Sequence, residues 1–459
     1  MTRFPAAPPL SGEPRPWSFP RTVVQDLSNG LRIVAINSGS LPIAQVRWVF
    51  GSGRIHEARN RLGSGLILQR AMRHGTKDLS ARAFAETLDR LGARMAGGVT
   101  IDSSIVSISG VSQHLWRFLD LATDVALQPA LPGVAAAAER LKAIQIHRHE
   151  WGQVENAVAL WLARSLYGEH PYGLPRTTES GLRQTSVEDL LALHQSIVDP
   201  HHGLLLVVGK VDVDSVVQRM AVRFGSMRFE TRPNLTAPPS FQPRRKTVVM
   251  IPMKSAKTTA IGLGLNAVAR SSPEYTPLRI VNQVFGGSAS SRLFRSLRDE
   301  RGLCYGAFSA LDCGRLGGDL TAVINLAPER ACEGFSALYG ELEKMAHGQI
   351  TPEELSHAQR FLVGSFPQRT SGLAGLATLA TASWMHNLPD DVWSTAQVRL
   401  NAVTLAQAND CSARYLRPDQ ATWVVAGRPD GLTRLEDVAK KMGLEIVYQT
   451  MEDLENTFG

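Results

Sequence analysis

Long apolar runs and CxxC cysteine pairs are missing from this sequence, and its first residues do not resemble a secretion signal. No stretch reaches the ~18 apolar residues that cross a bilayer, so we expect no membrane segment. The first twenty residues, MTRFPAAPPLSGEPRPWSFP, are rich in proline and lack an apolar core with a cleavage site, which predicts a flexible tail over 1–20 and no secretion signal. The four cysteines, Cys304, Cys313, Cys332 and Cys411, form no CxxC pair, which argues against zinc ribbons and redox motifs and predicts a reducing, cytoplasmic setting.

Charge is also not concentrated anywhere along the 459 residues. The formal net charge of +7 is spread over the chain, without the basic clusters interleaved with aromatic residues that bind nucleic acid. We therefore expect no nucleic-acid partner. A basic cavity that attracts acidic or extended peptides would account for the same charge. The length suggests two to four domains at roughly 150 residues each.

An internal repeat is the clearest organisational feature. TSVEDLLALHQSIVDPHHGLLLVVGKVD begins at Thr185, and NAVTLAQANDCSARYLRPDQATWVVAGRPD begins at Asn401. In each copy a helical pattern ends near a proline, an apolar strand follows, and a glycine stands nine positions after that proline. The sequence therefore predicts a duplicated strand and helix unit.

A proline-rich stretch separates the two copies. SMRFETRPNLTAPPSFQPRRK, residues 226–246, holds four prolines and no apolar periodicity, which predicts an extended linker. The halves are then 21–225 and 247–450, each with strands first, helices in the middle and a strand and helix at its end. This order predicts an α+β fold of two homologous repeats, each a mainly antiparallel sheet packed with helices.

Two helices are expected soon after the first strands. GSGLILQRAMRHGT, residues 63–76, has the pattern of a helix that Gly75 closes, since glycine favours the position after a helix. A second helix should begin near Ser80. The preceding strand alternates apolar residues from Ala44 to Phe50, as a strand with one buried face does.

Several of these motifs occur in an order that resembles a known family. The helix ending in GT, the later LGAR and GEHPYG, and FGGSASSRLFRSLRDERGLCYGAFS from Phe285 resemble the insulinase/pitrilysin zinc peptidases, in particular their mitochondrial-processing-peptidase-like, half-length bacterial branch. The resemblance extends over nearly the whole chain from about residue 22. Within GEHPYG, His170 is expected to mark a turn.

The resemblance also shows what this chain lacks. Active members carry an inverted HxxEH motif on the first helix, where two histidines bind zinc and the glutamate activates water. Here Leu66 and Arg70 stand at the histidine positions and Gln69 at the glutamate position. A leucine has no lone pair to donate, and a protonated arginine repels a dication. The sequence therefore predicts neither a metal nor a catalytic base in this helix.

No other residues restore the site. Counting back from GEHPYG places the third ligand of the family, a glutamate, at Ile146. His147 and His149 point about 200° apart on a helix, and His201 and His202 are adjacent in a turn. We expect these histidines to be exposed or to cap turns, and we expect no metal in this chain.

The second half keeps residues that the resemblance assigns to substrate binding. In the family an arginine and a tyrosine, spaced as Arg298 and Tyr305 are here, contact the peptide backbone and the tetrahedral intermediate. Both side chains can donate hydrogen bonds to a developing oxyanion. The alternative is that Arg298 pairs with Asp299 or Glu300 while Tyr305 belongs to the core. We also expect Leu303, Tyr305 and the residues after them to form a strand.

A glycine-rich loop precedes this motif. GGSASS, which includes Gly286 and Gly287, lacks the GK[ST] ending of a phosphate loop. Glycines allow close approach of a substrate backbone or a turn of the chain itself. In the resembled mitochondrial enzyme the non-catalytic subunit uses such a loop for presequence binding, which makes both glycines candidate substrate contacts here.

The resulting hypothesis is a division of labour between two chains. The resemblance implies that this chain is inactive on its own, that a paralogous HxxEH-containing subunit supplies zinc, and that the pair hydrolyses unfolded or short peptides. Two alternatives remain open: a scaffold protein of peptidase fold without a proteolytic partner, and a self-sufficient peptidase with a rebuilt metal site.

Overall fold

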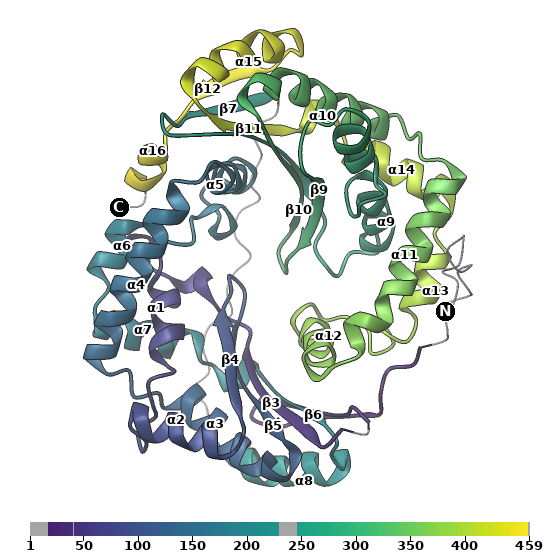
Figure 1. Cartoon of the computed structure of the whole chain (residues 1–459). Helices are drawn as coiled ribbons and strands as arrows, with labels where there is room; N and C mark the ends of the chain where they lie inside the picture. Colours follow the sequence, from purple (N-terminus) through teal and green to yellow (C-terminus); the bar gives the residue numbers. More distant parts are fainter. Residues whose placement is uncertain (1–16, 40, 229–245, 458–459) are drawn as a thin grey trace, which may run out of the picture.

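A computed structural model describes residues 17–39, 41–228 and 246–457 (Figure 1). Most of the predicted tail over 1–20, and nearly all of the predicted linker over 226–246, lie outside these described residues. The domain boundary placed in that linker therefore stays a prediction. Among the described residues, no helix is long and apolar enough to cross a membrane.

The elements of the first half run from residue 22 to 225. They are β1 (Thr22–Asp26), β2 (Arg32–Asn37), β3 (Ile43–Phe50), α1 (Ser64–Ala71), α2 (Ala81–Arg90), β4 (Arg94–Val99), β5 (Ser104–Val111), α3 (Leu115–Leu127), α4 (Gly133–Trp151), α5 (Val154–Tyr167), α6 (Glu179–Gln184), α7 (Val187–Ile197), β6 (Gly203–Gly209) and α8 (Val213–Gly225).

The second half follows the same plan. Its elements are β7 (Thr247–Pro252), β8 (Thr259–Ala267), α9 (Tyr275–Phe285), the π-helix η6 (Phe294–Glu300), β9 (Ala307–Cys313), β10 (Gly318–Leu326), α10 (Ala331–Ala346), α11 (Pro352–Thr370), α12 (Leu373–Met385), α13 (Ala396–Asn401), α14 (Leu405–Tyr415), β11 (Thr422–Gly427), α15 (Pro429–Lys441), β12 (Glu445–Tyr448) and α16 (Met451–Asn456).

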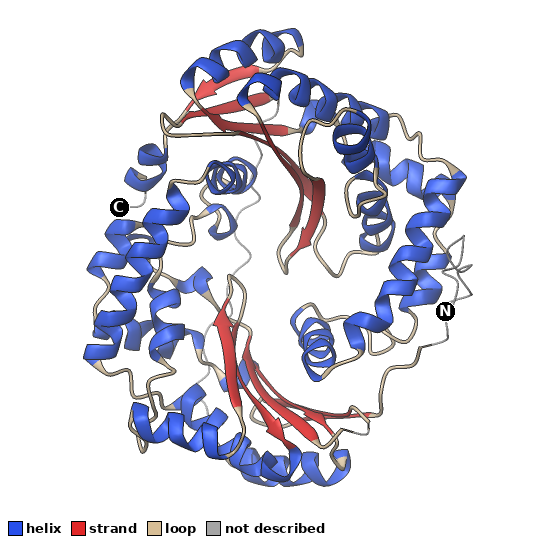
Figure 2. Cartoon of the chain, viewed as in Figure 1, coloured by secondary structure: helices blue, strands red, loops and turns tan. Residues whose placement is uncertain are grey.

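Two six-stranded sheets form the framework, and helices surround them (Figure 2). The strand orders are β1-β2-β6-β3-β5-β4 and β12-β7-β11-β8-β10-β9. The repeat strands β6 and β11 occupy equivalent places: each pairs in parallel with one neighbour and antiparallel with the other. The predicted α+β fold with two mainly antiparallel sheets is confirmed.

Local sequence explains why the repeat units start alike. Before β6, Ser186 caps α7 and shares reciprocal hydrogen bonds with Asp189. Before β11, Thr404 caps α14 in the same way with Gln407. Such capping boxes satisfy amide groups that have no partner within the helix. Both copies of the repeat thus fix the beginning of the helix that leads into their central strand.

Each half lends a helix to the sheet of the other half. Helix α5, from the first half, packs on β8 and β11, while α12, from the second half, packs on β6 and β3. Figure 1 shows α5 beside the upper sheet and α12 beside the lower one. Val158 and Leu162 of α5 share a core with Val424 of β11, and Leu376 of α12 shares another with Leu206 of β6. The two halves are therefore joined by their cores.

This exchange corrects one expectation from the sequence. Strand β3 was expected to bury a single face, yet every residue from Ala44 to Phe50 is buried. The polar side chains Gln45 and Arg47 are covered as well, and Arg47 Nη1 donates a hydrogen bond to Thr381 Oγ1 of α12 at 3.3 Å. The alternation was read correctly, but a helix from the other half covers the second face.

The first predicted helix also ends earlier than expected. Helix α1 stops at Ala71, and Gly75 lies beyond it at φ 109° in a turn bridged to Ser80. A Cβ atom at Gly75 would stand 2.4 Å from the Leu79 carbonyl oxygen, so glycine is needed for this turn. Helix α2 begins at Ala81 with Ser80 as its cap, which confirms that expectation.

Candidate functional site

A cavity of about 850 Å³ lies between the two halves. Helix α1 and the β4–β5 turn line it from the first half, and the β9–β10 hairpin and α12 line it from the second. The exchanged helix α5 completes the wall. Because both sheets and both exchanged helices contribute, the cavity exists only when the two halves are packed together.

Of the three α1 residues at the family's HxxEH positions, only Gln69 lines this cavity among the described residues. Leu66 is only 7% exposed and belongs to the core of the first half. Arg70 is partly buried on the same helix. Gln69 lines the cavity, and its Nε2 donates a hydrogen bond to the Gly97 carbonyl of β4 at 2.5 Å. Strand β4 is the edge of its sheet, so Gln69 binds the backbone of an edge strand.

These side chains do not fit a zinc ion. A buried leucine offers no donor, the amide of Gln69 is already directed at a carbonyl, and a guanidinium carries the wrong charge. Across residues 17–39, 41–228 and 246–457, no group of three His, Cys, Asp or Glu side chains is arranged to hold a metal.

The predicted third-ligand position is not directed at this site. Ile146 is 38% exposed on α4, whereas its neighbour His147 is only 4% exposed. His147 Nδ1 lies 2.9 Å from Thr177 Oγ1, and burial lowers the pKa of its imidazole to about 4. The expectation that this histidine is exposed or caps a turn is therefore wrong, since it supports the packing of α4.

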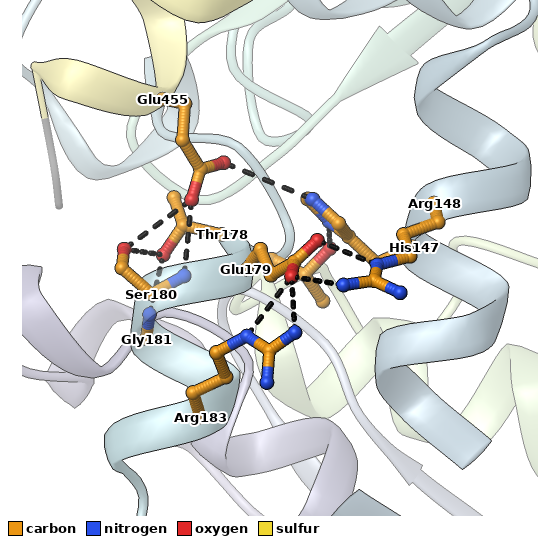
Figure 3. A network of polar contacts seen from close by, with 9 residues as sticks. His147, Arg148, Thr178, Glu179, Ser180, Gly181, Arg183 and Glu455 are labelled. Atoms are coloured by element: carbon orange, nitrogen blue, oxygen red, sulfur yellow. Dashed lines mark hydrogen bonds and ion pairs between the residues drawn. The ribbon is translucent and has the colours of Figure 1, made fainter. Parts of the chain in front are cut away.

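Figure 3 shows the polar network that holds His147 in place. Glu455 of α16 accepts hydrogen bonds from the backbone and hydroxyl of Ser180, at 3.1 and 3.3 Å. Its other oxygen lies 3.8 Å from His147 Nε2. In the same network Glu179 accepts a hydrogen bond from Arg148. The Arg148 guanidinium lowers the pKa of the Glu179 carboxyl to about 2. The network attaches the C-terminal helix α16 to the first half.

Of the other histidines singled out from the sequence, His149 is exposed on α4, as expected, and the remaining three stabilise turns. His201 Nδ1 is 2.6 Å from the Asn29 carbonyl, and His202 Nδ1 is 2.9 Å from Asp199 Oδ2. His170 accepts a hydrogen bond from the Tyr172 amide at 3.0 Å, which agrees with the turn predicted for GEHPYG.

Glu57 is the most unusual ionisable group near α1, and sequence reasoning missed it. Its side chain is 7% exposed and accepts hydrogen bonds from the Gly65 amide at 2.6 Å and the Gly63 amide at 3.4 Å. Burial raises its pKa to about 7, against the opposing field of Arg54. Glu57 thus supplies the first turn of α1 with an acceptor that the cap residue, a glycine, lacks.

We expect Glu57→Gln to change how stability depends on pH. In the folded chain the pKa of Glu57 is raised from 4.5 to about 7. The contribution of this raised pKa to folding stability is therefore complete below pH 4.5 and is lost as the pH rises through 7. The wild type should therefore lose stability between pH 4.5 and 7, and the variant should not. Over this pH range the unfolding free energy of the variant should rise relative to that of the wild type by up to about 3 kcal/mol.

Urea denaturation at several pH values between 4.5 and 8 measures this difference. The exposed Glu329→Gln variant is the matched control and should run parallel to the wild type. A Glu57→Gln curve that is also parallel to the wild type would show that burial of this carboxyl does not control the pH response.

Two tyrosine–aspartate pairs line the cavity wall. Tyr167 of α5 donates to Asp319 of β10 at 2.7 Å, and Tyr172 donates to Asp102 at 2.6 Å. Burial raises the pKa of Asp319 to about 6, and it also raises the pKa of Tyr167. The first pair connects the two halves directly. No short sequence motif could predict this pair, because its two residues are 152 positions apart.

Arg298 and Tyr305 are neighbours on the surface and do not line the large cavity. Tyr305 is 93% exposed, so the alternative that it belongs to the core is wrong. The Arg298 guanidinium lies 5.4 Å from the centre of the Tyr305 ring and 4.5 Å from that of Phe294. Glu300 lies 3.9 Å from Arg295, and no ion pair of Arg298 occurs among the described residues.

The local backbone differs from the expectation in one respect. Strand β9 begins only at Ala307, so Leu303 and Tyr305 precede it in a loop after the π-helix η6. Arg298 is exposed on η6 and Tyr305 is exposed in the loop after it, so both hydrogen-bond donors can reach a group outside this chain. Their assignment to substrate stays a prediction.

Gly286 and Gly287 are required by internal packing. A Cβ atom on Gly286 would lie 2.4 Å from the Ser309 amide nitrogen, and one on Gly287 would lie 2.7 Å from the Gln283 Cα. The Gly286 carbonyl accepts a hydrogen bond from that Ser309 amide at 2.9 Å. Close approach within the chain therefore explains both glycines, and their contact with substrate stays a prediction.

Sequence profiles of known families match most of the chain. One described as insulinase (peptidase family M16) matches residues 32–179, and one described as the peptidase M16 inactive domain matches residues 184–362. A Mycobacterium tuberculosis protein named as an uncharacterised zinc protease is 27% identical over 79% of this chain and 81% of its own length. A Helicobacter pylori protein named non-peptidase homolog YmxG is 17% identical over 84% and 89%.

Solved structures show the same fold. A peptidase M16 inactive domain from Pseudomonas fluorescens superposes with a TM-score of 0.81 at 21% identity, over 89% of this chain and 98% of that one. A Helicobacter pylori protein described as a protease also gives a TM-score of 0.81, at 18% identity, over 89% of this chain and 100% of that one. The relatives thus include proteins named as proteases and one named as a non-peptidase.

Proposed function

Because the chain belongs to the insulinase (peptidase M16) family, we propose that it is the non-catalytic subunit of a two-chain zinc metalloendopeptidase. The observation that carries this proposal is the state of α1. At the position where active members need a base, Gln69 hydrogen-bonds to the edge strand. At the position of the first ligand, Leu66 is part of the core. A single substitution could not restore such a site.

The contribution of this chain would lie in its second half. Arg298 and Tyr305 are exposed side by side, and Arg298 has no ion pair with a described residue. An arginine fork and a phenol hydroxyl can both donate to the carbonyl oxygen of a bound peptide as negative charge develops there. The partner, a paralogue with an intact HxxEH motif, would supply the zinc and the base. This chain would also form one wall of the chamber that holds the peptide.

The proposal predicts that activity needs both chains. Purified alone, this chain should contain no stoichiometric zinc and should leave an unstructured fluorogenic peptide intact. Coexpressed with a half-length paralogue that carries HxxEH, it should copurify as a heterodimer with one zinc, and this pair should cleave the peptide until a chelator is added. Elemental analysis, size-exclusion chromatography and the fluorescence assay provide the three measurements.

The control is the same pair with the glutamate of the partner's HxxEH motif replaced by glutamine. This variant pair should assemble and bind zinc without cleaving. Chelator-sensitive cleavage by this chain alone would overturn the proposal. Recovery of the chain in an assembly that holds no HxxEH protein would instead favour the scaffold alternative.

A further inference from the structure

A second cavity lies in the second half, separate from the large one. Its volume is about 350 Å³. It is lined by the loop from Arg270 into the start of α9, by Arg279 of α9, and by residues 388–389, 392–393, 396 and 399–400 in and around α13. Figure 1 shows α9, α11 and α13 next to one another in this region. Neither the profile matches nor the peptidase proposal assigns a role to this cavity.

Three arginines converge on this cavity without a carboxylate. Arg270, Arg279 and Arg399 all line it, and among the described residues none of the three has an ion pair with an aspartate or glutamate. All three are partly buried, and a charge withdrawn from water without a partner is costly, because desolvation is not offset by attraction. Burial lowers the pKa of Arg270 and Arg279, and each is lowered further by a neighbouring arginine.

Contacts within the chain satisfy these groups only in part. Arg270 stacks on Tyr275, with its guanidinium carbon 3.7 Å from the ring centre. Arg399 donates from Nη2 to the Val392 carbonyl, but its Nε is buried and has no hydrogen-bond partner among the described residues. The Arg279 guanidinium donates no hydrogen bond to any residue in the described part of the chain. An acceptor in the cavity would complete each of these groups.

Three acidic residues lie close in sequence to the lining residues. Asp390 and Asp391 are exposed and do not line the cavity, and Glu274 is already engaged. Glu274 immediately precedes α9, yet its carboxylate accepts hydrogen bonds from Arg414 and Tyr415. It is also not among the residues that line the cavity. A rotation of this side chain toward the arginines would break both hydrogen bonds. The missing negative charge must therefore come from elsewhere.

We propose that this cavity is a binding site for a small, multiply charged oxyanion. Guanidinium groups bind phosphate and carboxylate oxygens through paired hydrogen bonds. The hydroxyl groups of Ser271 and Thr276 also line the cavity and can donate to the same ligand. A volume of about 350 Å³ is within the usual range for a small-molecule site. This inference does not depend on the peptidase role.

Inorganic pyrophosphate is the probe that tests the site. Titrated into the full chain at constant ionic strength, it should give saturable heat in calorimetry and raise the melting temperature. Arg279→Met keeps the apolar stem and removes the charge, so it should weaken binding by about 10-fold or more. Without the anion, this variant should melt at the same temperature as the wild type or higher, since an unpaired charge is gone.

Arg434→Met is the matched control, because it removes one exposed arginine from α15 in the same half. It should bind pyrophosphate like the wild type. Citrate distinguishes the source of the negative charge: tighter binding of pyrophosphate indicates a phosphoryl ligand, and tighter binding of citrate indicates a polycarboxylate. The proposal is overturned if neither anion gives saturable heat, or if the Arg279→Met variant binds pyrophosphate as tightly as the wild type.

Discussion

The double variant Arg298→Ala/Tyr305→Phe, assembled with its zinc-bearing partner, is expected to hydrolyse an unstructured peptide about 10²- to 10³-fold more slowly than the wild-type pair. Both side chains are hydrogen-bond donors on the surface of this chain. If they stabilise the oxyanion of the transition state, the loss should fall on kcat. The two changes should not add fully, because the donors act on one group.

Assembly of the pair should survive this double change. Tyr305 is 93% exposed, and Arg298 is exposed too, with its guanidinium near the Tyr305 and Phe294 rings. Substitutions at such positions usually change stability by about 0.5 kcal/mol or less. The kinetic loss can therefore be separated from a loss of folding by size-exclusion chromatography and thermal melting of the same samples.

Matched substitutions in the same half provide the control for this experiment. Arg434→Ala and Tyr448→Phe also remove an exposed guanidinium and a phenol hydroxyl from the second half. They should leave kcat unchanged. An unchanged kcat in the Arg298/Tyr305 variant would exclude the role assigned to the two residues, and an effect on KM alone would assign them to ground-state binding of the peptide.

Truncating a core side chain of the exchanged helix α5 should produce the largest loss of stability. Leu162 is 2% exposed and packs between the first half and the second sheet. Leu162→Ala should cost about 2–5 kcal/mol, from lost burial and the cavity that remains. Because α5 joins the halves, the same change should loosen the wall of the large cavity. Urea denaturation measures the cost.

The fit of α5 against the second sheet can be tested from the opposite side. A Cβ atom on Gly262 would lie 2.3 Å from Val158 Cγ1 and 2.7 Å from Leu162 Cδ1. Gly262→Ala should therefore cost about 1–3 kcal/mol through overpacking. Adding Val158→Ala removes the clashing methyl group, so the double variant should be more stable than the sum of the two single losses predicts.

The control for this cycle is a glycine with open space around it. Gly340 lies within α10, and no atom stands within 4 Å of a Cβ built there. Gly340→Ala should raise stability by about 0.5–1 kcal/mol, because alanine favours the helix. Strict additivity of the Gly262 and Val158 changes would contradict the packing of α5 on β8.

The sequence could predict a good part of the candidate site. The identities of Leu66, Gln69 and Arg70 exclude zinc ligation wherever the helix lies, because ligation depends on donor atoms. It could not predict the partners of these residues. Gln69 reaches Gly97 only because β4 lies at the edge of its sheet beside α1. The burial of Glu57 could not be predicted, because no feature of the neighbouring sequence indicates a buried carboxyl.

What the sequence determined by itself was local and chemical: the duplicated strand and helix units, the α+β class and the lack of zinc donors at Leu66, Gln69 and Arg70. Periodicity and side-chain chemistry carry that information over short distances along the chain. Only the tertiary structure decided that α5 and α12 pack on the sheets of opposite halves, that β3 is covered on both faces, and that Arg270, Arg279 and Arg399 share a cavity. These contacts join residues far apart in sequence, and an apolar pattern predicts burial without naming the surface that provides it.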